Sequence, residues 1–210
     1  GGGVYWDNGV GVTVQDNIVV DPIGNMESIA MDHQTNVTVR VGIYFGNAII
    51  TNATVRRNTA ANCDLGLWVD HTMVSHGHQI RDNVMFNNKD AQMGFSDFSN
   101  YNGPGAAYPF ALPGYDDIYT NNTCYAMSNT QMCILAVNRW YNGVDFGTFA
   151  NNKYHNPWNG NSFMIQKFVP SYDITYHGLA SWLSIQGDET GSSNSPLSLT
   201  YPDGVDDHIL

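Results

Sequence analysis

A four-residue unit recurs along the chain: an apolar residue, two variable residues and then asparagine. The unit occurs as VQDN, VRRN, IRDN, YTNN and FANN, which end at Asn17, Asn58, Asn83, Asn122 and Asn152. The intervals between copies are irregular, which is typical of a repeated element with inserted loops and not of propeller blades of fixed length. Asparagine readily adopts the left-handed backbone of a sharp bend. The pattern therefore predicts a repetitive all-β fold in which each short strand ends at an asparagine bend.

Two other segments fit the same unit less closely. In VRVG, Gly42 stands where the other copies have asparagine, and glycine also adopts left-handed backbone easily. Residues 174–177 resemble a last, degraded copy. We expect both segments to occupy the bend that the five asparagine units share.

A second set of segments alternates apolar and polar residues, as a half-buried strand does. Its members are GVYWDN (3–8), SIAMDH (28–33), GLWVDH (66–71), QMGFSD (92–97) and SFMIQK (162–167). We expect them to stack as one parallel sheet with their apolar residues inward. GIYFGN (42–47) fits too, but it begins only 14 residues after the second member, so we interpret it as a later strand of the same coil.

Length and composition favour a single domain over residues 1–210. The chain is 42% hydrophobic and 13% charged, enough apolar residues for one buried core. Residues 98–117 are rich in Gly, Pro and Tyr and predict a loop insertion, and 192–210 predict an irregular C-terminal tail. The abrupt start at Gly1 leaves open that this is the C-terminal part of a longer chain.

The net charge of −11 argues against nucleic acid and membrane as partners, since both surfaces are anionic. Many Asn, Gly, Thr and Tyr residues with few lysines favour a secreted protein. Three cysteines without CxxC spacing indicate buried apolar fillers, with one bonded pair as the alternative, and no zinc site. His76 and His78 provide only two metal ligands, and we expect them in a loop or turn.

The strand and asparagine units, the opening GGGVYWDNGVGVTVQDNIV and the ending YDITYHGLASWLSIQGDETGSS resemble the right-handed parallel β-helix proteins of the pectate-lyase-like superfamily. The resemblance covers most of the chain. It implies a single-stranded right-handed parallel β-helix in which stacked asparagines form a hydrogen-bonded ladder. It also implies an extracellular protein that binds a polysaccharide or oligosaccharide along the outer face of its first sheet.

Carboxylates recur on the face where that family binds glycans. With coils about 4.8 Å apart, we expect Asp7 and Asp32 to form a carboxylate pair suited to glycoside hydrolysis. Asp70, His33 and His71 would support this pair, and Tyr5, Trp68 and Asp97 would bind substrate, with the two aromatic rings as sugar platforms. The alternative is structural: the aspartates cap strand ends, and the two rings pack under loops.

Other functions stay open beside a hydrolase that needs no metal. Asp7, Asp32, Asp70 and Asp97 would also be ligands for Ca²⁺ in a polysaccharide lyase, although cationic residues to serve as its base are few. A non-catalytic surface, adhesion or filament rod is the third interpretation, supported by the lack of an evident capping helix. An uncovered first coil would expose strand edges, so another chain or a second copy would cover it.

Overall fold

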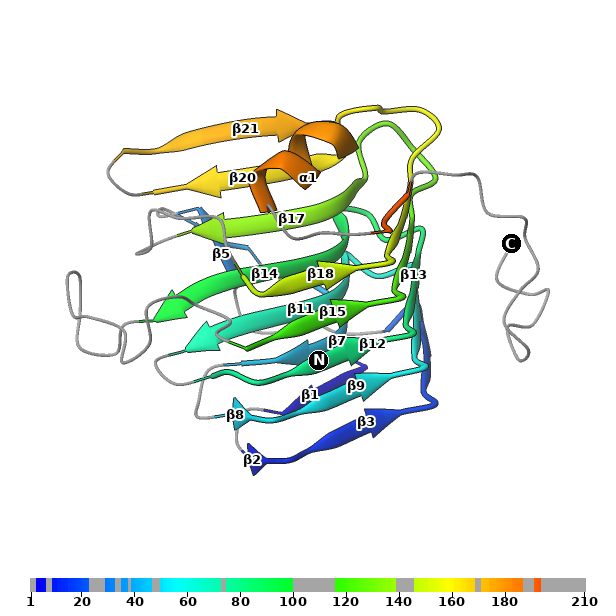
Figure 1. Ribbon diagram of the computed structural model, residues 1–210, viewed down its shortest axis with the longest axis vertical. Coiled ribbons are helices and arrows are strands. Elements are labelled where there is room, and N and C mark those ends of the chain that lie inside the picture. The colour runs from blue at the N-terminus through cyan, green and yellow to red at the C-terminus, as the bar shows by residue number, and fades with distance from the viewer. Residues whose placement is uncertain are drawn as a thin grey trace.

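The computed structural model describes residues 3–6, 9–22, 29–32, 35–37, 39–46, 50–72, 75–99, 116–138, 146–168, 171–186 and 191–193. For 29–32, 35–37, 72 and 97–99 it describes the backbone alone. Within these ranges the chain is mostly β-strand with one short helix, α1 (Leu179–Gln186). Most strands lie in parallel sheets, which confirms the predicted all-β class (Figure 1).

Seven strands form the largest sheet, called the long sheet below. In spatial order they are β1 (Val4–Trp6), β7 (Val41–Phe45), β11 (Leu65–Thr72), β14 (Ala91–Ser99), β17 (Met132–Asn138), β20 (Phe163–Lys167) and β21 (Asp173–His177). All neighbouring pairs are parallel except the last, because β21 runs antiparallel to β20.

Two five-stranded parallel sheets complete the stack. The second sheet contains β3 (Thr13–Gln15), β9 (Thr54–Arg56), β12 (Gln79–Arg81), β15 (Ile118–Thr120) and β18 (Thr148–Ala150). The third sheet contains β4 (Ile18–Val20), β10 (Thr59–Ala61), β13 (Val84–Phe86), β16 (Thr123–Tyr125) and β19 (Lys153–His155). The chain visits the long, second and third sheets in this order and then returns to the long sheet, and we call one such passage a circuit.

Two small pairs accompany the main sheets. The strands β2 (Gly9–Val10) and β8 (Ile50–Thr51) pair in parallel between the long and second sheets of the first two circuits. The strands β5 (Ile29–Asp32) and β6 (Thr35–Val37) pair with each other in antiparallel fashion, outside the three main sheets.

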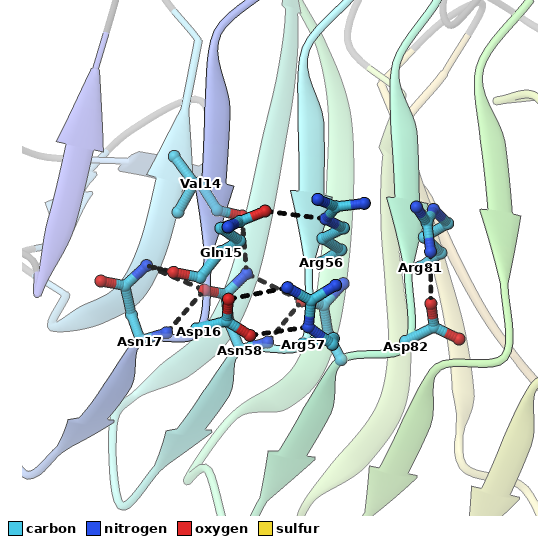
Figure 2. A network of polar contacts seen from close by, with 10 residues as sticks. Val14, Gln15, Asp16, Asn17, Arg56, Arg57, Asn58, Arg81 and Asp82 are labelled. Carbon is cyan, nitrogen blue, oxygen red and sulfur yellow. Dashed lines mark hydrogen bonds and ion pairs between the residues drawn. The ribbon is translucent and has the colours of Figure 1, made fainter.

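The five predicted asparagines stand at the bend between the second and third sheets and form a hydrogen-bonded ladder. Side-chain Nδ2 to Oδ1 distances are 2.9 Å for Asn17 to Asn58, 2.9 Å for Asn58 to Asn83, 3.0 Å for Asn83 to Asn122 and 3.2 Å for Asn122 to Asn152. The first of these bonds is visible in Figure 2. Beyond the last asparagine, the backbone N–H of Asn152 donates to Ser192 Oγ at 2.9 Å.

Each inner asparagine satisfies the backbone on both sides of the bend. Asn83 Nδ2 donates to the Val55 carbonyl at 2.9 Å, and its Oδ1 accepts the backbone N–H of Asn58 at 3.1 Å. The residue just before the ladder asparagine has positive φ in every circuit: Asp16, Arg57, Asp82, Asn121 and Asn151. The strand registers align the apolar residues three places earlier, so the recurring unit is confirmed as one strand and its bend.

The main core fills the space between the sheets with inward-facing apolar side chains. Leu67, Val69, Met93 and Phe95 of the long sheet are fully buried there, as the alternation predicts. The helix α1 closes one end of this core, because Trp182 is fully buried and stacks on Phe163 at 5.3 Å (Figure 1). The sequence did not reveal this capping helix.

Two sequence interpretations are wrong, and a third is confirmed. Gly42 lies inside β7 and not at a bend; an added Cβ there would come 2.7 Å from Ala60 Cβ and from the Gly66 carbonyl, so glycine permits close packing of sheets. Residues 174–177 belong to the antiparallel β21 and not to a last copy. Cys63, Cys124 and Cys133 are buried and unbonded, as the filler interpretation expects.

Candidate functional site

The outer face of the long sheet carries a row of side chains that the strand register places side by side. In order, the row is Tyr5, Tyr44, Trp68, Gly94, Leu135 and Met164. Tyr44 occupies the second place, which the sequence assigned to residues 28–33. That assignment is wrong, since β5 pairs with β6 and β1 is adjacent to β7. The premise that placed Asp32 beside Asp7 in neighbouring coils therefore fails.

Asp70 lies two residues beyond this row and is the one predicted carboxylate whose side chain is described. Its exposed fraction is 2%. It accepts hydrogen bonds from Tyr44 Oη at 2.6 Å, from Trp68 Nε1 at 2.9 Å and from Ser96 Oγ. An added Cβ at Gly46 would lie 2.2 Å from Asp70 Cβ, so the absence of a side chain at Gly46 makes room for the carboxylate.

The aromatic side chains next to Asp70 differ in exposure. Tyr5 is 47% exposed and stacks on Tyr44, with ring centroids 5.1 Å apart and planes at 8°. Trp68 is fully buried, so the packed alternative for this ring holds and an exposed sugar platform there does not. A continuous line thus runs from an exposed ring, Tyr5, through Tyr44 to the buried carboxylate of Asp70.

His71 faces away from Asp70, into the interior of the molecule. Its Nδ1 lies 2.9 Å from the Ser96 carbonyl and its Nε2 lies 2.8 Å from Asp117 Oδ2. Both ring nitrogens therefore have an oxygen partner in the interior. Because consecutive residues of a strand point to opposite faces, Asp70 and His71 cannot act on the same solvent face. This alternation could be seen in the sequence, but the sequence analysis nevertheless expected Asp70 and His71 to support the same carboxylate pair.

The partner of His71, Asp117, was predicted only as the last residue of the loop insertion 98–117. Asp117 is fully buried, and its Oδ1 accepts the backbone N–H of His78 at 2.7 Å. His78 Nδ1 in turn accepts the backbone N–H of Ala53 at 3.2 Å. Burial lowers the pKa of His78 to about 4, so this ring is neutral near pH 7. We call His71, His78 and Asp117 the interior polar cluster; no sequence motif marks it, since its members come from distant segments.

Several predicted site residues cannot be placed. Asp7 and His33 lie outside the described residues, and Asp32 and Asp97 are described by backbone only. The predicted insertion 98–117 and tail 192–210 also lie mostly outside the described ranges. The proposed roles of Asp7, Asp32, His33 and Asp97 stay predictions.

Much of the long sheet's outer face around this site is apolar and buried. Val41, Leu65, Leu135, Val137 and Phe168 pack with Tyr44 and Trp68 in a second apolar cluster. Buried thiols offer no nucleophile, because burial raises the pKa of Cys63 and of Cys133 to about 12. Asp70 with Tyr44, Trp68, Ser96 and the exposed Tyr5 is therefore the candidate site, called the Asp70 site below.

Among the described residues, no group of three or more His, Cys, Asp or Glu side chains could hold a metal ion. The described part of the chain also forms no helix long and apolar enough to cross a membrane. Comparison with known proteins finds no matching family model, no similar curated protein and no similar solved structure. Function therefore has to be argued from the geometry of the chain itself.

Proposed function

We propose that the chain is a single-stranded right-handed parallel β-helix of the pectate-lyase-like type. Support comes from the repeated circuits through three parallel sheets and from the asparagine ladder at one bend. The packing of α1 over one end of the core adds to this, because an elongated stack of strands needs a cover at its ends.

On this fold we propose a secreted protein that acts on a polysaccharide, with glycoside hydrolysis as its activity. The observation that carries the proposal is the line from Tyr5 through Tyr44 to Asp70. An exposed tyrosine ring offers a flat face to a sugar, and a carboxylate lies behind it. Glycosidases use such a carboxyl group to protonate the leaving oxygen or to attack the sugar.

Hydrolysis requires a second carboxylate, and Asp7 is the proposed one. Asp7 follows Tyr5 by two residues, as Asp70 follows Trp68 in the same row of the sheet. In this proposal Asp70 and Asp7 share the acid and nucleophile or base roles, and Tyr5 binds the sugar. Tyr44 orients Asp70 through its 2.6 Å hydrogen bond.

The non-catalytic rod is the second candidate, and one observation favours it. The Asp70 carboxylate already accepts three hydrogen bonds and is buried, so a sugar reaches it only if its cover moves. The lyase alternative has less support: in the described strands of the long sheet, Lys167 is the one Lys or Arg side chain available as a base. Ca²⁺ belongs to that alternative only.

A depolymerisation screen on neutral and uronate-containing polysaccharides tests the proposal. It would follow new reducing ends and the absorbance of unsaturated products for wild type, Asp70→Asn and Asp7→Asn. We expect reducing ends without unsaturation and a loss of about 100-fold or more in each variant, the scale of general acid catalysis. Asp173→Asn is the matched control, since Asp173 is an exposed aspartate on β21.

The other outcomes separate the alternatives. Unsaturated products would establish a lyase and overturn hydrolysis. Absence of cleavage by a wild-type protein that still unfolds cooperatively would move the assignment to the non-catalytic rod. Full activity in Asp70→Asn would remove the Asp70 site from the mechanism.

A further inference from the structure

One edge of the long sheet is open at the end of the stack that α1 closes. Among the described strands, β21 pairs with β20 alone, and it is the outermost strand at the top of Figure 1. Its surroundings at this end are covered, because α1 packs on the core and Ser193 forms a parallel bridge with Lys153 of β19. The backbone groups on the far side of β21 therefore have no partner strand in the described part of the chain.

The outer face of β21 carries a stripe of large apolar side chains. Tyr176 is the register partner of Met164 and extends the outer row of the long sheet by one strand. Ile174 lies two residues earlier on the same face, and Tyr172, two residues before it, accepts a hydrogen bond from Gln166 Nε2 at 3.4 Å. The exposed fractions are 58% for Tyr172, 36% for Ile174 and 55% for Tyr176. Single exposed apolar residues are ordinary, whereas a continuous stripe along a strand marks a contact surface.

The β21 strand lacks the features that keep an edge strand from pairing. Protein edges are commonly very short, or they carry lysine, proline or a bulge. The sequence of β21, DITYH, contains none of these residues, and its register with β20 is unbroken over all five residues. The last strands of the other two sheets, β18 and β19, have three residues each, and β19 begins with a lysine. The far side of β21 is thus available to another strand.

The sequence of β21 is complementary to itself in an antiparallel pair. When two copies pair about Thr175, this residue faces its own counterpart across a twofold axis. Ile174 then faces Tyr176 of the second copy, and Asp173 faces His177 of the second copy. Pairs of threonines, of aromatic with β-branched residues and of a carboxylate with an imidazole are favourable neighbours across strands. The one carboxylate of β21 never meets its own counterpart in this register.

The charge of the surrounding segment also favours a second copy of the chain. With a net charge of −11, two copies repel each other unless they meet at a patch with few carboxylates. Residues 171–186, which include β21 and α1, contain Asp173 as their one Asp, Glu, Lys or Arg. Depletion of charge together with exposed tyrosines is the composition of an interface centre.

We propose that β21 pairs antiparallel with β21 of a second copy of this chain, so that two long sheets join into one sheet across a twofold axis at Thr175. The outer rows of the two copies then meet through Tyr176. This interface lies at the opposite end of the stack from the first circuit, where the sequence analysis expected a covering chain. It does not depend on hydrolysis. Five paired residues make a small interface, so the dissociation constant should be on the order of micromolar.

Sedimentation equilibrium of the intact chain, from about 1 to about 200 µM, tests the association. We expect a monomer–dimer equilibrium. The variant I174K/Y176K places two charges in the exposed stripe and should weaken dimerisation about tenfold or more, because like charges then face each other across the axis. The matched control is I18K/V20K, which changes two exposed apolar residues at the same spacing on β4, the edge strand at the other end of the stack. It should leave the dissociation constant within about twofold.

Cysteine substitutions test the register. Thr175→Cys should give a disulfide-linked dimer on oxidation, because the two Cβ atoms face each other about 5 Å apart. Ile174→Cys and Tyr176→Cys should link poorly when each is alone, but a mixture of the two should form a linked heterodimer. The native cysteines are buried and give little background on a non-reducing gel.

Each opposing result has a defined meaning. A wild-type chain that stays monomeric, or a dimer that I174K/Y176K leaves unchanged, would overturn the interface. Loss of the dimer in I18K/V20K alone would place the contact at the first circuit and would overturn the proposal as well. Cross-linking of Ile174→Cys with itself, but not of Thr175→Cys, would overturn the register. Urea unfolding checks that each lysine variant folds; if I174K/Y176K does not, the Thr175→Cys cross-link decides.

Discussion

Two regions of the molecule place their polar side chains differently, the asparagine bend and the polar end of β11. Between the second and third sheets, every circuit uses asparagine, and each inner asparagine makes the same hydrogen bonds. Along β11 of the long sheet, by contrast, each polar side chain has its own partners, as Asp70 and His71 show. Because the ladder needs asparagine in every circuit, this position cannot carry acidic, basic or aromatic side chains. Acid, base and aromatic groups therefore accumulate where the repeat is broken.

The comparison also concerns charge. The ladder joins neutral amides, which need no counterion and do not titrate. The interior polar cluster contains His78, whose pKa is lowered by burial, so its contribution to stability depends on whether that ring is protonated. The two regions should accordingly respond differently to mutation and to pH.

The largest effect is expected inside the ladder. Asn83→Ala removes the acceptor of Asn58 N–H, the acceptor of Asn58 Nδ2 and the donor to the Val55 carbonyl, all buried groups. We expect a loss of about 4 kcal/mol in the free energy of unfolding, from urea denaturation. Asn17→Ala at the partly exposed end of the ladder should cost only about 1 kcal/mol, because Asn58 Oδ1 still accepts the backbone N–H of residue 17. Equal losses would show that the ladder is not cooperative along its length.

The next effect separates the two regions by pH. The folded-state pKa of His78 is about 4, below the ordinary 6.5 that the unfolded chain retains, so the unfolded state binds the proton first. The stability that neutral His78 contributes is fully present above about pH 6.5 and is lost as the pH drops from about 6.5 to about 4. About 2.5 pKa units correspond to a loss of about 3 kcal/mol. Urea unfolding at pH 7, 5.5 and 4 measures it.

His78→Asn isolates this contribution. Asparagine can still accept the Ala53 N–H but does not titrate, so the variant should lack about 3 kcal/mol of the acid-dependent loss. Other titrating groups, such as Asp64 with its lowered pKa, remain in both proteins and cancel in the difference. His177→Asn, on the partly exposed end of β21, is the control and should keep the wild-type slope. Parallel stability curves for wild type and His78→Asn would contradict the assignment.

The two regions also differ in how far sequence alone could predict them. The bend asparagines follow from a repeated residue at a fixed offset, whereas their hydrogen-bonded ladder was implied by the resemblance, and both are confirmed. The inward rows are confirmed on β11, β14 and β20. The position of residues 28–33 could not be predicted from the sequence. Their alternation matches that of the long sheet, but β5 pairs with the neighbouring β6 instead. Gly42 misled for a related reason: glycine serves a bend through its φ and a strand through its small size, and here it serves the strand.

The candidate site was predictable only in part. Alternation places Trp68 and Asp70 outward, but it says nothing about what covers that face, and both are buried. Asp117 reaches His71 across 46 residues of sequence, a contact that only the register of distant strands creates. The α1 cap is only eight residues long, with Trp182 buried and Leu179 and Leu183 partly buried beside it, so its apolar stripe was too short to stand out in the sequence.

A smaller effect tests whether the Asp70 site is held by several independent bonds. Tyr44→Phe keeps the ring stacked on Tyr5 but removes one of the donors to Asp70, and we expect a loss of about 1 kcal/mol. Trp68 Nε1 and Ser96 Oγ still hold the carboxylate. Tyr125→Phe, which keeps the packing of this ring on Phe86, is the control and should be near neutral. If hydrolysis is established, Tyr44→Phe should also lower kcat, because Asp70 loses its orientation.

The smallest effect tests whether the regular bend is purely structural. Arg57→Asn replaces the one exception among the positive-φ residues with a residue that the bend prefers, and it gives up an exposed ion pair with Asp16. Exposed ion pairs contribute little, whereas relief of a left-handed arginine is favourable. We expect the melting temperature to rise by about 2 °C in a thermal scan. A clear fall would mean that Arg57 is there for stability, as the other bend residues are. A rise would mean that the chain keeps a destabilising residue, Arg57, in the otherwise regular asparagine bend. The contrast between a purely structural asparagine bend and a functional region in the long sheet would then not hold at Arg57.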